Sequence, residues 1–380
     1  MGLGFSFTTE QDELREQVRE FAMKELAPNA ARWASEGKLP FDAIDAMAGQ
    51  GLLGFTFPEE VGGQGRSWVD FAIVLEELGR ADISCNWICS MGNSYPKVLD
   101  DPVVIGQIIR GEKVLAFAET EPQSGGDAAA IKTTAERKGD HYVIDGTKTY
   151  VSLVPGAQLL LVTALTDPAA GRNGMSMFLV DADAPGVSIT EIPEPGVKAH
   201  MLGTILFDRV EIPIDRLVGQ ENDGFRMMRS RWDYTRGVGP TAIIGAALQS
   251  LDETVQRAKE KETFGKPLLK WEAIQFKLVD GYTRVEAARL LAYKSAWLAD
   301  QGERVTAYAS MLKTYVSEIC LKAVMDCLDI WGGAAFREDH PVFRRFLDIR
   351  GYQAAGGGQD IHRIILGTEL FGREYAAHRD

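Results

Sequence analysis

One glycine-rich segment has a composition that could bind a ligand. It is Thr120-Glu121-Pro122-Gln123-Ser124-Gly125-Gly126-Asp127. Adjacent glycines let backbone N–H groups approach a ligand closely, because no Cβ stands between them. An ordinary β-turn has the same composition, so the loop alone does not distinguish a ligand-binding loop from a turn. A second candidate is the pair Asp233 and Arg236, three residues apart in a helical stretch. Their spacing suits contact with a ligand and equally a simple (i, i+3) ion pair.

Composition narrows the classes of function. The 380 residues include 41 Lys and Arg against 54 Asp and Glu, a net charge of −13 with no basic block, which argues against nucleic acid as a partner. No apolar run approaches the roughly 20 residues of a membrane-spanning helix. The cysteine pairs Cys85/Cys89 and Cys320/Cys327 have spacings typical of neither zinc knuckles nor CxxC redox pairs, so we expect buried thiols. These features predict a soluble, cytoplasmic protein without a membrane partner.

Residues 8–110 have helical periodicity. Leu14, Val18, Phe21 and Leu26 recur at helical spacing over 10–28, with Thr9 as the expected N-cap. Further helices are expected over 42–50 and 69–79. Between them, residues 57–65 contain too many Gly and Pro residues to stay helical.

The pattern then changes to short β-branched and aromatic runs separated by turns. The expected strands are 114–118, 131–136, 142–144, 159–164, 177–180, 187–191 and 205–212. No helical pattern lies between them, which favours a mainly antiparallel barrel or sandwich.

From residue 223 on, long helical patterns with short links predict a four-helix bundle. We therefore predict an α+β multidomain fold. Its parts are an N-terminal helical domain over 1–113, a central β domain over 114–222 and a C-terminal helical bundle over 223–380.

Several segments, in order along the chain, resemble signatures of the acyl-CoA dehydrogenase family. They are Phe21-Ala22-Met23-Lys24-Glu25-Leu26-Ala27-Pro28, Pro58-Glu59-Glu60-Val61-Gly62-Gly63, the loop 120–127, Gly146-Thr147-Lys148-Thr149-Tyr150-Val151-Ser152, Phe207-Asp208-Arg209-Val210-Glu211-Ile212-Pro213, Phe264-Gly265-Lys266-Pro267-Leu268 and Trp331-Gly332-Gly333. The resemblance spans nearly the whole chain and implies the same order of helical, β and helical domains. It also implies a homotetramer with one non-covalent FAD per subunit.

Carried over residue by residue, the resemblance places Phe117 and Thr120 along the flavin ring. Tyr150 stands where the family usually has Trp, which keeps a flat ring against the flavin. Ser152 matches the hydroxyl that hydrogen-bonds flavin N5, an atom that alternates between acceptor and donor as the flavin cycles.

Other expected FAD contacts depart from the family pattern. Lys261 replaces an Arg that faces the pyrophosphate, so it keeps the charge but loses the bidentate fork. Glu272 and Asp329 stand where Gln is usual and would add negative charge near a diphosphate. Phe264 and Gly333 match contacts to the dinucleotide of a neighbouring subunit. The remaining expected FAD contacts are Gly126, Gly358 and Asp360. On the substrate side, Asp233 and Arg236 match a pair that contacts the pantetheine and phosphate of coenzyme A.

The family reaction needs a carboxylate that takes the α-proton of an acyl thioester. The usual Glu position is Gly356, and the alternative position used by a minority of the family is Thr235. Neither side chain can act as a base at neutral pH. Asp360, Tyr352, Tyr95 and Cys89 are other candidates that nothing in the sequence singles out.

Three functions remain open. The first is FAD-dependent α,β-dehydrogenation of an acyl thioester with hydride transfer to flavin N5. The second is a related flavoenzyme of different chemistry, namely an oxygenase or oxidase, an enoyl-thioester reductase or an elimination enzyme. The third is a non-catalytic binder of FAD or an acyl thioester. The carrier is coenzyme A or an acyl carrier protein, and the electron acceptor is an electron-transfer flavoprotein or oxygen.

Overall fold

The computed structural model describes residues 6–376, except for the side chains of Arg231, Asp233, Tyr234 and Thr235. Contacts divide the chain into two compact units. Unit 1 comprises the residues up to Arg32, Arg66–Trp87 and the residues from Arg236 on, and unit 2 comprises Trp33–Gly65 and Ile88–Thr235. Helices α5 (Ile83–Gly92) and α7 (Gly224–Val238) each continue from one unit into the other.

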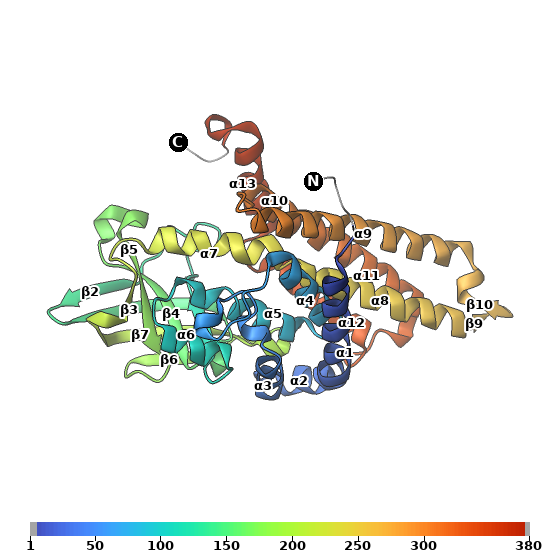
Figure 1. The fold of residues 1–380 in the computed structure, drawn as a ribbon, viewed down its shortest axis with the longest axis horizontal. Helices are drawn as coiled ribbons and strands as arrows, with labels where there is room; N and C mark the ends of the chain where they lie inside the picture. Colours follow the sequence, from blue (N-terminus) through green and yellow to red (C-terminus); the bar gives the residue numbers. More distant parts are fainter. Residues whose placement is uncertain (1–5, 377–380) are drawn as a thin grey trace. The chain divides into compact units, whose positions relative to one another are not determined.

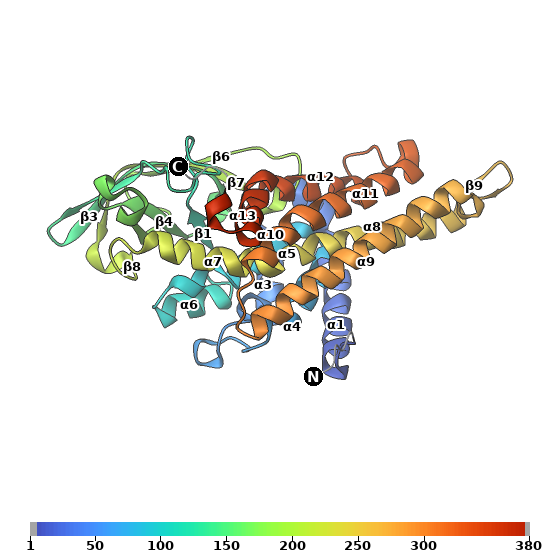
Figure 2. The same cartoon turned by 90° about the horizontal axis from the view of Figure 1, so that it is seen from above.

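Unit 1 is helical (Figures 1 and 2). Its N-terminal helices are α1 (Thr9–Phe21) and α4 (Trp68–Ala81), and its C-terminal helices are α8 (Thr241–Glu260), α9 (Glu272–Asp300), α10 (Thr306–Met311), α11 (Ser317–Trp331), α12 (Pro341–Ala354) and α13 (Gln359–Phe371). Long helices α8 and α9 run side by side, and the short hairpin β9–β10 (Glu262–Thr263, Lys266–Pro267) joins their ends in both views. Helices α8, α9, α11 and α12 form the predicted bundle, α4 packs onto α8 and α9, and α1 packs onto α4.

Close packing of α4 on α8 depends on two glycines. A Cβ at Gly79 would lie 2.1 Å from the carbonyl oxygen of Ala242, and one at Gly245 would lie 1.9 Å from that of Glu76. Two buried carboxylates of α4 are paired nearby: Glu77 accepts from Arg19 at 2.8 Å, and Glu76 accepts from Arg289 at 2.9 Å. Buried carboxylates are retained when paired in this way.

Two helical predictions need correction. Thr8, not Thr9, caps α1, because its hydroxyl accepts from the backbone N–H of Gln11 while the Gln11 side chain accepts from Thr8 N–H. The spacing of Leu312, Tyr315 and Ile319 along the chain predicts one regular helix. Residues Leu312–Val316 instead form a π-helical turn between α10 and α11, and Ala22–Leu26 form another after α1.

Unit 2 is built on a sheet with the strand order β6-β7-β3-β2-β4-β5-β8, and β1 pairs with β4 (Figure 1). The strands are β1 (Leu115–Ala118), β2 (Thr134–Lys138), β3 (His141–Ser152), β4 (Leu159–Leu165), β5 (Met175–Asp181), β6 (Val187–Glu191), β7 (Leu202–Pro213) and β8 (Leu217–Val218). Strand β4 is parallel to β1 and β2, and the other pairs are antiparallel. The sheet is thus mainly antiparallel, as expected. Helices α3 (Phe41–Gly49) and α6 (Pro102–Ile109) belong to this unit, and α2 (Ala30–Glu36) begins in unit 1 and ends in unit 2.

Cys85, Cys89, Cys320 and Cys327 are all free and buried, which confirms the expectation of core thiols. Within residues 6–376, no helix is both long and apolar enough to cross a bilayer.

Candidate active site

The glycine-rich loop of unit 2 starts from a buried ion pair. Lys148 on β3 donates to Glu121 Oε1 at 2.7 Å, and neither side chain is more than 2% exposed. Lys148 also donates to Thr163 Oγ1 at 3.2 Å, and Glu121 accepts from the backbone N–H groups of Lys132 and Thr133. Burial lowers the pKa of Lys148 to about 8 despite the neighbouring Glu121 carboxylate. These bonds fix the backbone at the start of the loop, beside Thr120.

The same unit brings several predicted flavin contacts together. The backbone N–H of Thr149 donates to the carbonyl oxygen of Thr120 at 2.8 Å, which joins the end of β1 to the stretch of β3 that carries Tyr150 and Ser152. A register shift between Lys148 and Val151 includes Tyr150, whose φ is 53° and whose side chain is 65% exposed. Such an irregularity turns a side chain away from the regular pleat. Phe117 is buried and packs against Tyr95 at 5.7 Å between ring centres, while Gly126 is exposed.

Glu119 is a carboxylate that the sequence interpretation missed. It lies between Ala118, the last residue of β1, and Thr120, and its side chain is half-buried. Its Oε2 accepts a hydrogen bond of 3.2 Å from the indole Nε1–H of Trp232 on α7. The sequence could have pointed to Glu119 because it is an acidic residue directly before the Thr120 loop. Its hydrogen-bond donor, Trp232, is far away in sequence and gives no local indication.

The remaining predicted FAD contacts lie in unit 1. Lys261 follows α8, and Phe264 stands in the β9–β10 hairpin with a φ of 51° and 90% exposure, 6.2 Å from the ring of Trp271. Glu272 is the exposed first residue of α9. Asp329 forms an ion pair with Lys277, and Gly333 lies in a short 3₁₀ turn after α11. The charge of Asp329 is therefore compensated locally, whereas Glu272 forms no ion pair with any side chain that the structure describes.

The segment that precedes α13 contains Gly356, Gly357 and Gly358. Gly356 and Gly357 have φ values of 65° and 93°, which side chains rarely adopt. A Cβ at Gly356 would enter open space, while one at Gly357 would lie 3.5 Å from Arg236 Nη2 and 3.3 Å from His362 Nε2. Arg236 therefore lies directly against this loop. The side chains of Thr235 and Asp233 are outside the described part of the chain, so their predicted roles stay predictions.

Basic and aromatic groups gather beside the loop. The Lys313 ammonium lies 4.1 Å from the centre of the Tyr352 ring and donates to the Tyr352 carbonyl oxygen. The edge of the Trp87 ring packs against Tyr352, with ring centres 5.4 Å apart. Burial and the Arg236 charge lower the pKa of Lys313 to about 7 and that of His362 to about 4. His362 is fully buried and therefore neutral at pH 7.

The surroundings of the other candidate bases make them poor acceptors of the α-proton. Asp360 is exposed and forms an ion pair with Arg363 at 3.2 Å. Burial raises the pKa of the Cys89 thiol and of the Tyr352 phenol well above the usual range. Tyr95 is buried against Phe117. Glu119 is a carboxylate next to a predicted flavin contact.

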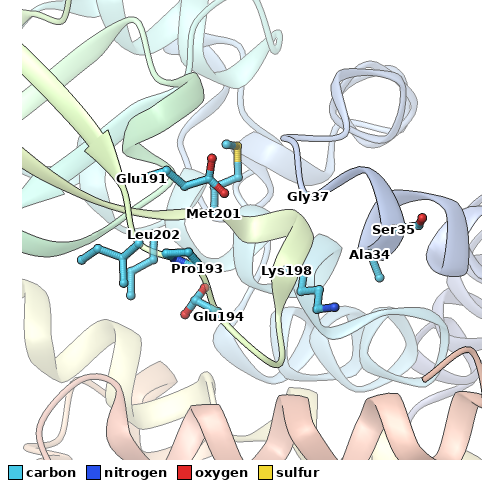
Figure 3. A pocket seen from close by; sticks show the side chains of 10 residues that line it. Ala34, Ser35, Gly37, Glu191, Pro193, Glu194, Lys198, Met201 and Leu202 are labelled. Carbon is cyan, nitrogen blue, oxygen red and sulfur yellow. The ribbon is translucent and has the colours of Figure 1, made fainter. Parts of the chain in front are cut away.

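Unit 2 also has a hollow of about 240 Å³ that is separate from the predicted site residues. Its polar wall includes Ser35 after the start of α2, and Glu194 and Lys198 from the segment after β6 (Figure 3). None of the predicted site residues lines it.

Comparison with known proteins decides the family. The profile described as "Acyl-CoA dehydrogenase, N-terminal domain" matches residues 8–98, "Acyl-CoA dehydrogenase, middle domain" matches 116–210 and "Acyl-CoA dehydrogenase, C-terminal domain" matches 222–371. The chain belongs to the acyl-CoA dehydrogenase family. An acyl-CoA dehydrogenase of Bacillus subtilis (strain 168) is 34% identical, covering 96% of this chain and 99% of that protein. A 3-(aryl)acrylate reductase of Clostridium sporogenes is also 34% identical, covering 96% and 99%.

Solved structures agree with this assignment. The complex of glutaryl-coenzyme A dehydrogenase with glutaryl-CoA has a TM-score of 0.92 and 29% identity, covering 99% of this chain and 98% of that one. Membership in the acyl-CoA dehydrogenase family confirms the predicted fold class, FAD as the cofactor and an FAD-dependent oxidoreductase that acts on an acyl thioester. The comparisons do not favour the two alternative functions.

Proposed function

We propose that this acyl-CoA dehydrogenase family member removes hydrogen from the α and β carbons of a saturated acyl-CoA. The observation that supports the proposal is the bond between Thr149 N–H and the Thr120 carbonyl oxygen, because it joins Thr120, a predicted flavin contact, to the stretch of β3 that carries the predicted contacts Tyr150 and Ser152. These groups fit a flat heteroaromatic molecule with hydrogen-bonding edges. FAD, when bound, accepts the hydride from the β-carbon.

The predicted contacts have distinct roles in this proposal. Phe117, Thr120, Gly126, Tyr150 and Ser152 hold the flavin ring, and Lys261, Phe264, Glu272, Asp329, Gly333, Gly358 and Asp360 belong to the rest of the FAD site. Asp233 and Arg236 contact the substrate. Residues 1–113, 114–222 and 223–380 act as the three functional domains.

We propose that Glu119 is the base that accepts the α-proton of the acyl thioester. A carboxylate is ionised at neutral pH and can take a proton from carbon when it is held in position. The Trp232 indole N–H holds Glu119 Oε2 in position at 3.2 Å. Gly356 carries no side chain for this role.

Coenzyme A is the proposed carrier, with an acyl carrier protein as the second option. We propose that electrons pass on to an electron-transfer flavoprotein, with oxygen as the alternative acceptor. A cytoplasmic homotetramer, or a dimer, is the proposed assembly. Large apolar side chains exposed on α9, Phe276, Val279, Leu290 and Trp297, support association between subunits.

The test is an anaerobic visible spectrum of the purified protein before and after saturated acyl-CoAs of several chain lengths are added. Bleaching of the flavin bands is expected, and 2-enoyl-CoA should appear in equal amount. A flavin that stays oxidised with every acyl-CoA would refute dehydrogenation. A colourless protein whose bands do not return with added FAD would refute the flavoenzyme itself.

A further inference from the structure

All three hydrogens of the Lys148 ammonium group are used in hydrogen bonds around the start of the Thr120 loop. The group donates to Glu121 Oε1 at 2.7 Å, to Thr163 Oγ1 at 3.2 Å and to the backbone carbonyl oxygen of Glu119 at 3.3 Å. An ammonium group has three donors and no acceptor, so its bonding capacity is filled. One fully buried side chain thus holds the residue before Thr120 and the residue after it.

Two further bonds extend this support along the segment. Thr163 Oγ1 donates to the carbonyl oxygen of Ala118 at 3.4 Å, and the backbone N–H of Thr149 donates to that of Thr120 at 2.8 Å. Four consecutive residues are therefore held, through their carbonyl or carboxylate oxygens, from strands β3 and β4. All of these residues belong to unit 2.

The charged groups that face the ammonium group are the carboxylates of Glu121 and Glu119. Strand β1 has no charged residue, β4 contributes Thr163, and β7 carries Ile205 in register with Lys148. Burial disfavours the charged form of Lys148 while the two carboxylates favour it, and the pKa is lowered to about 8. Lys148 therefore changes charge within a pH range in which an enzyme can be assayed.

The three bonds are unequal, which identifies the one that deprotonation breaks. When the ammonium group gives a proton to the solvent, the amine keeps two N–H donors for three acceptors. The bond to the Glu119 carbonyl is the longest, and the Glu121 carboxylate is a stronger acceptor than a carbonyl. Loss of the proton therefore releases the backbone of Glu119 first.

We propose that Lys148 is a positioning residue for the reaction, which in its charged form holds the backbone of Glu119 and Thr120 in the productive arrangement. This inference rests on the proposed function, in which Glu119 accepts the α-proton. Lys148 holds the main chain of Glu119 and Trp232 holds its side chain. Displacement of a catalytic group by about 1 Å can slow a reaction about 10²-fold.

The first test is the rate of anaerobic flavin reduction in the purified holoenzyme from pH 6 to pH 9.5. The substrate is the saturated acyl-CoA that bleaches the flavin fastest in the chain-length panel, at saturating concentration. The rate should fall about tenfold or more with a midpoint near pH 8. A rate that does not fall in this range would overturn the proposal.

Three variants assign that fall to Lys148. Glu121→Gln removes the carboxylate that favours the charged ammonium, so the midpoint should move down by about one pH unit or more. Lys148→Arg keeps its charge throughout and should abolish the fall. Lys97→Met is the matched control, because burial also lowers the pKa of Lys97 to about 8, and its profile should keep the wild-type midpoint. A lower rate in Glu121→Gln with an unmoved midpoint would show a merely structural pair and overturn the proposal.

Hydrogen exchange gives a readout that needs neither substrate nor turnover. Protection factors, corrected for the intrinsic effect of pH, are measured by mass spectrometry at pH 7 and pH 9 for the peptide that covers 115–121. Protection should drop about tenfold in the wild type and stay constant in Lys148→Arg, with the peptide of β5 as the internal reference. Constant protection in the wild type would contradict the release of Glu119.

The outcomes also separate this inference from the proposed function. A flavin that is reduced by saturated acyl-CoAs, with a rate independent of pH around 8, refutes the role of Lys148 alone. A flavin that no acyl-CoA reduces at any pH refutes the proposed function, while the exchange experiment still tests whether Lys148 holds the segment.

Discussion

His362 Nε2 donates to the carbonyl oxygen of Gly356 at 3.1 Å, and His362 Nδ1 lies 3.4 Å from Ser310 Oγ. A carbonyl oxygen only accepts, so the neutral ring carries its proton on Nε2. A fully buried imidazole thereby connects the loop at the predicted base position to α10. The family's usual Glu is missing from this loop, yet its backbone is firmly held.

The first prediction concerns pH and His362. Its pKa is lowered to about 4 in the folded protein, mainly by burial and then by Arg236, against about 6.5 in an unfolded chain. Between these values the unfolded state binds a proton that the folded state does not. The free energy of unfolding should therefore fall as the pH drops from 6.5 to 4, by about 3 kcal/mol in all. Thermal midpoints measured from pH 7 to pH 4.5 should show a flatter dependence in His362→Gln, and parallel curves would contradict the assignment.

The second prediction concerns the buried pair below the Thr120 loop. Lys148→Met leaves the Glu121 carboxylate buried without its cation and should lower the free energy of unfolding by about 3–5 kcal/mol. The double variant Lys148→Met/Glu121→Gln should recover part of that loss, because no buried charge remains. Urea unfolding measures both. Lys138→Met, an exposed lysine on β2, is the control and should change little.

The third prediction separates two carboxylates near the expected diphosphate. Glu272→Gln should tighten FAD binding about two- to fivefold, because it removes an unpaired negative charge. Asp329→Asn should not, because Lys277 already neutralises Asp329. Fluorescence titration of the flavin-free protein at low and high salt gives both constants. The gain in FAD affinity of Glu272→Gln should shrink at high salt. Equal effects of the two variants would contradict the claim that only Glu272 carries an uncompensated charge.

The fourth prediction tests Glu119 as the proton acceptor. Glu119→Gln should slow anaerobic flavin reduction by roughly 10²–10⁴-fold, the usual contribution of a positioned base. Trp232→Phe removes the indole donor and should reduce the rate less, with a shifted pH profile. Stopped-flow absorbance measures the rates, with Glu136→Gln on the exposed part of β2 as control. Unchanged flavin content with an unchanged rate in Glu119→Gln would rule the residue out.

The sequence predicted the order of the elements well, because periodicity reports burial directly. Strand β6 begins and ends where its pattern does, and α4 covers the helix predicted over 69–79. The cap at Thr8 was missed because two adjacent threonines look alike until the partner Gln11 is placed. Much of the site depends on contacts between distant segments. Glu119 with Trp232, and Lys313 with Tyr352, are separated by 113 and 39 residues. No local pattern marks such pairs, and the assigned roles of the FAD and substrate residues stay predictions.

The π-helical turn at Leu312–Val316 restricts how this gene can change. A π turn holds one residue more than the α-helical path would need, and each residue of a helix turns the following ones by about 100°. Substitutions within the turn alter one side chain at a time. A deletion of a single codon there would rotate all of α11 relative to Lys313, and it would swing buried Cys320 and Cys327 toward solvent. Variation by insertion or deletion should therefore be rejected at this turn, even where point changes are tolerated.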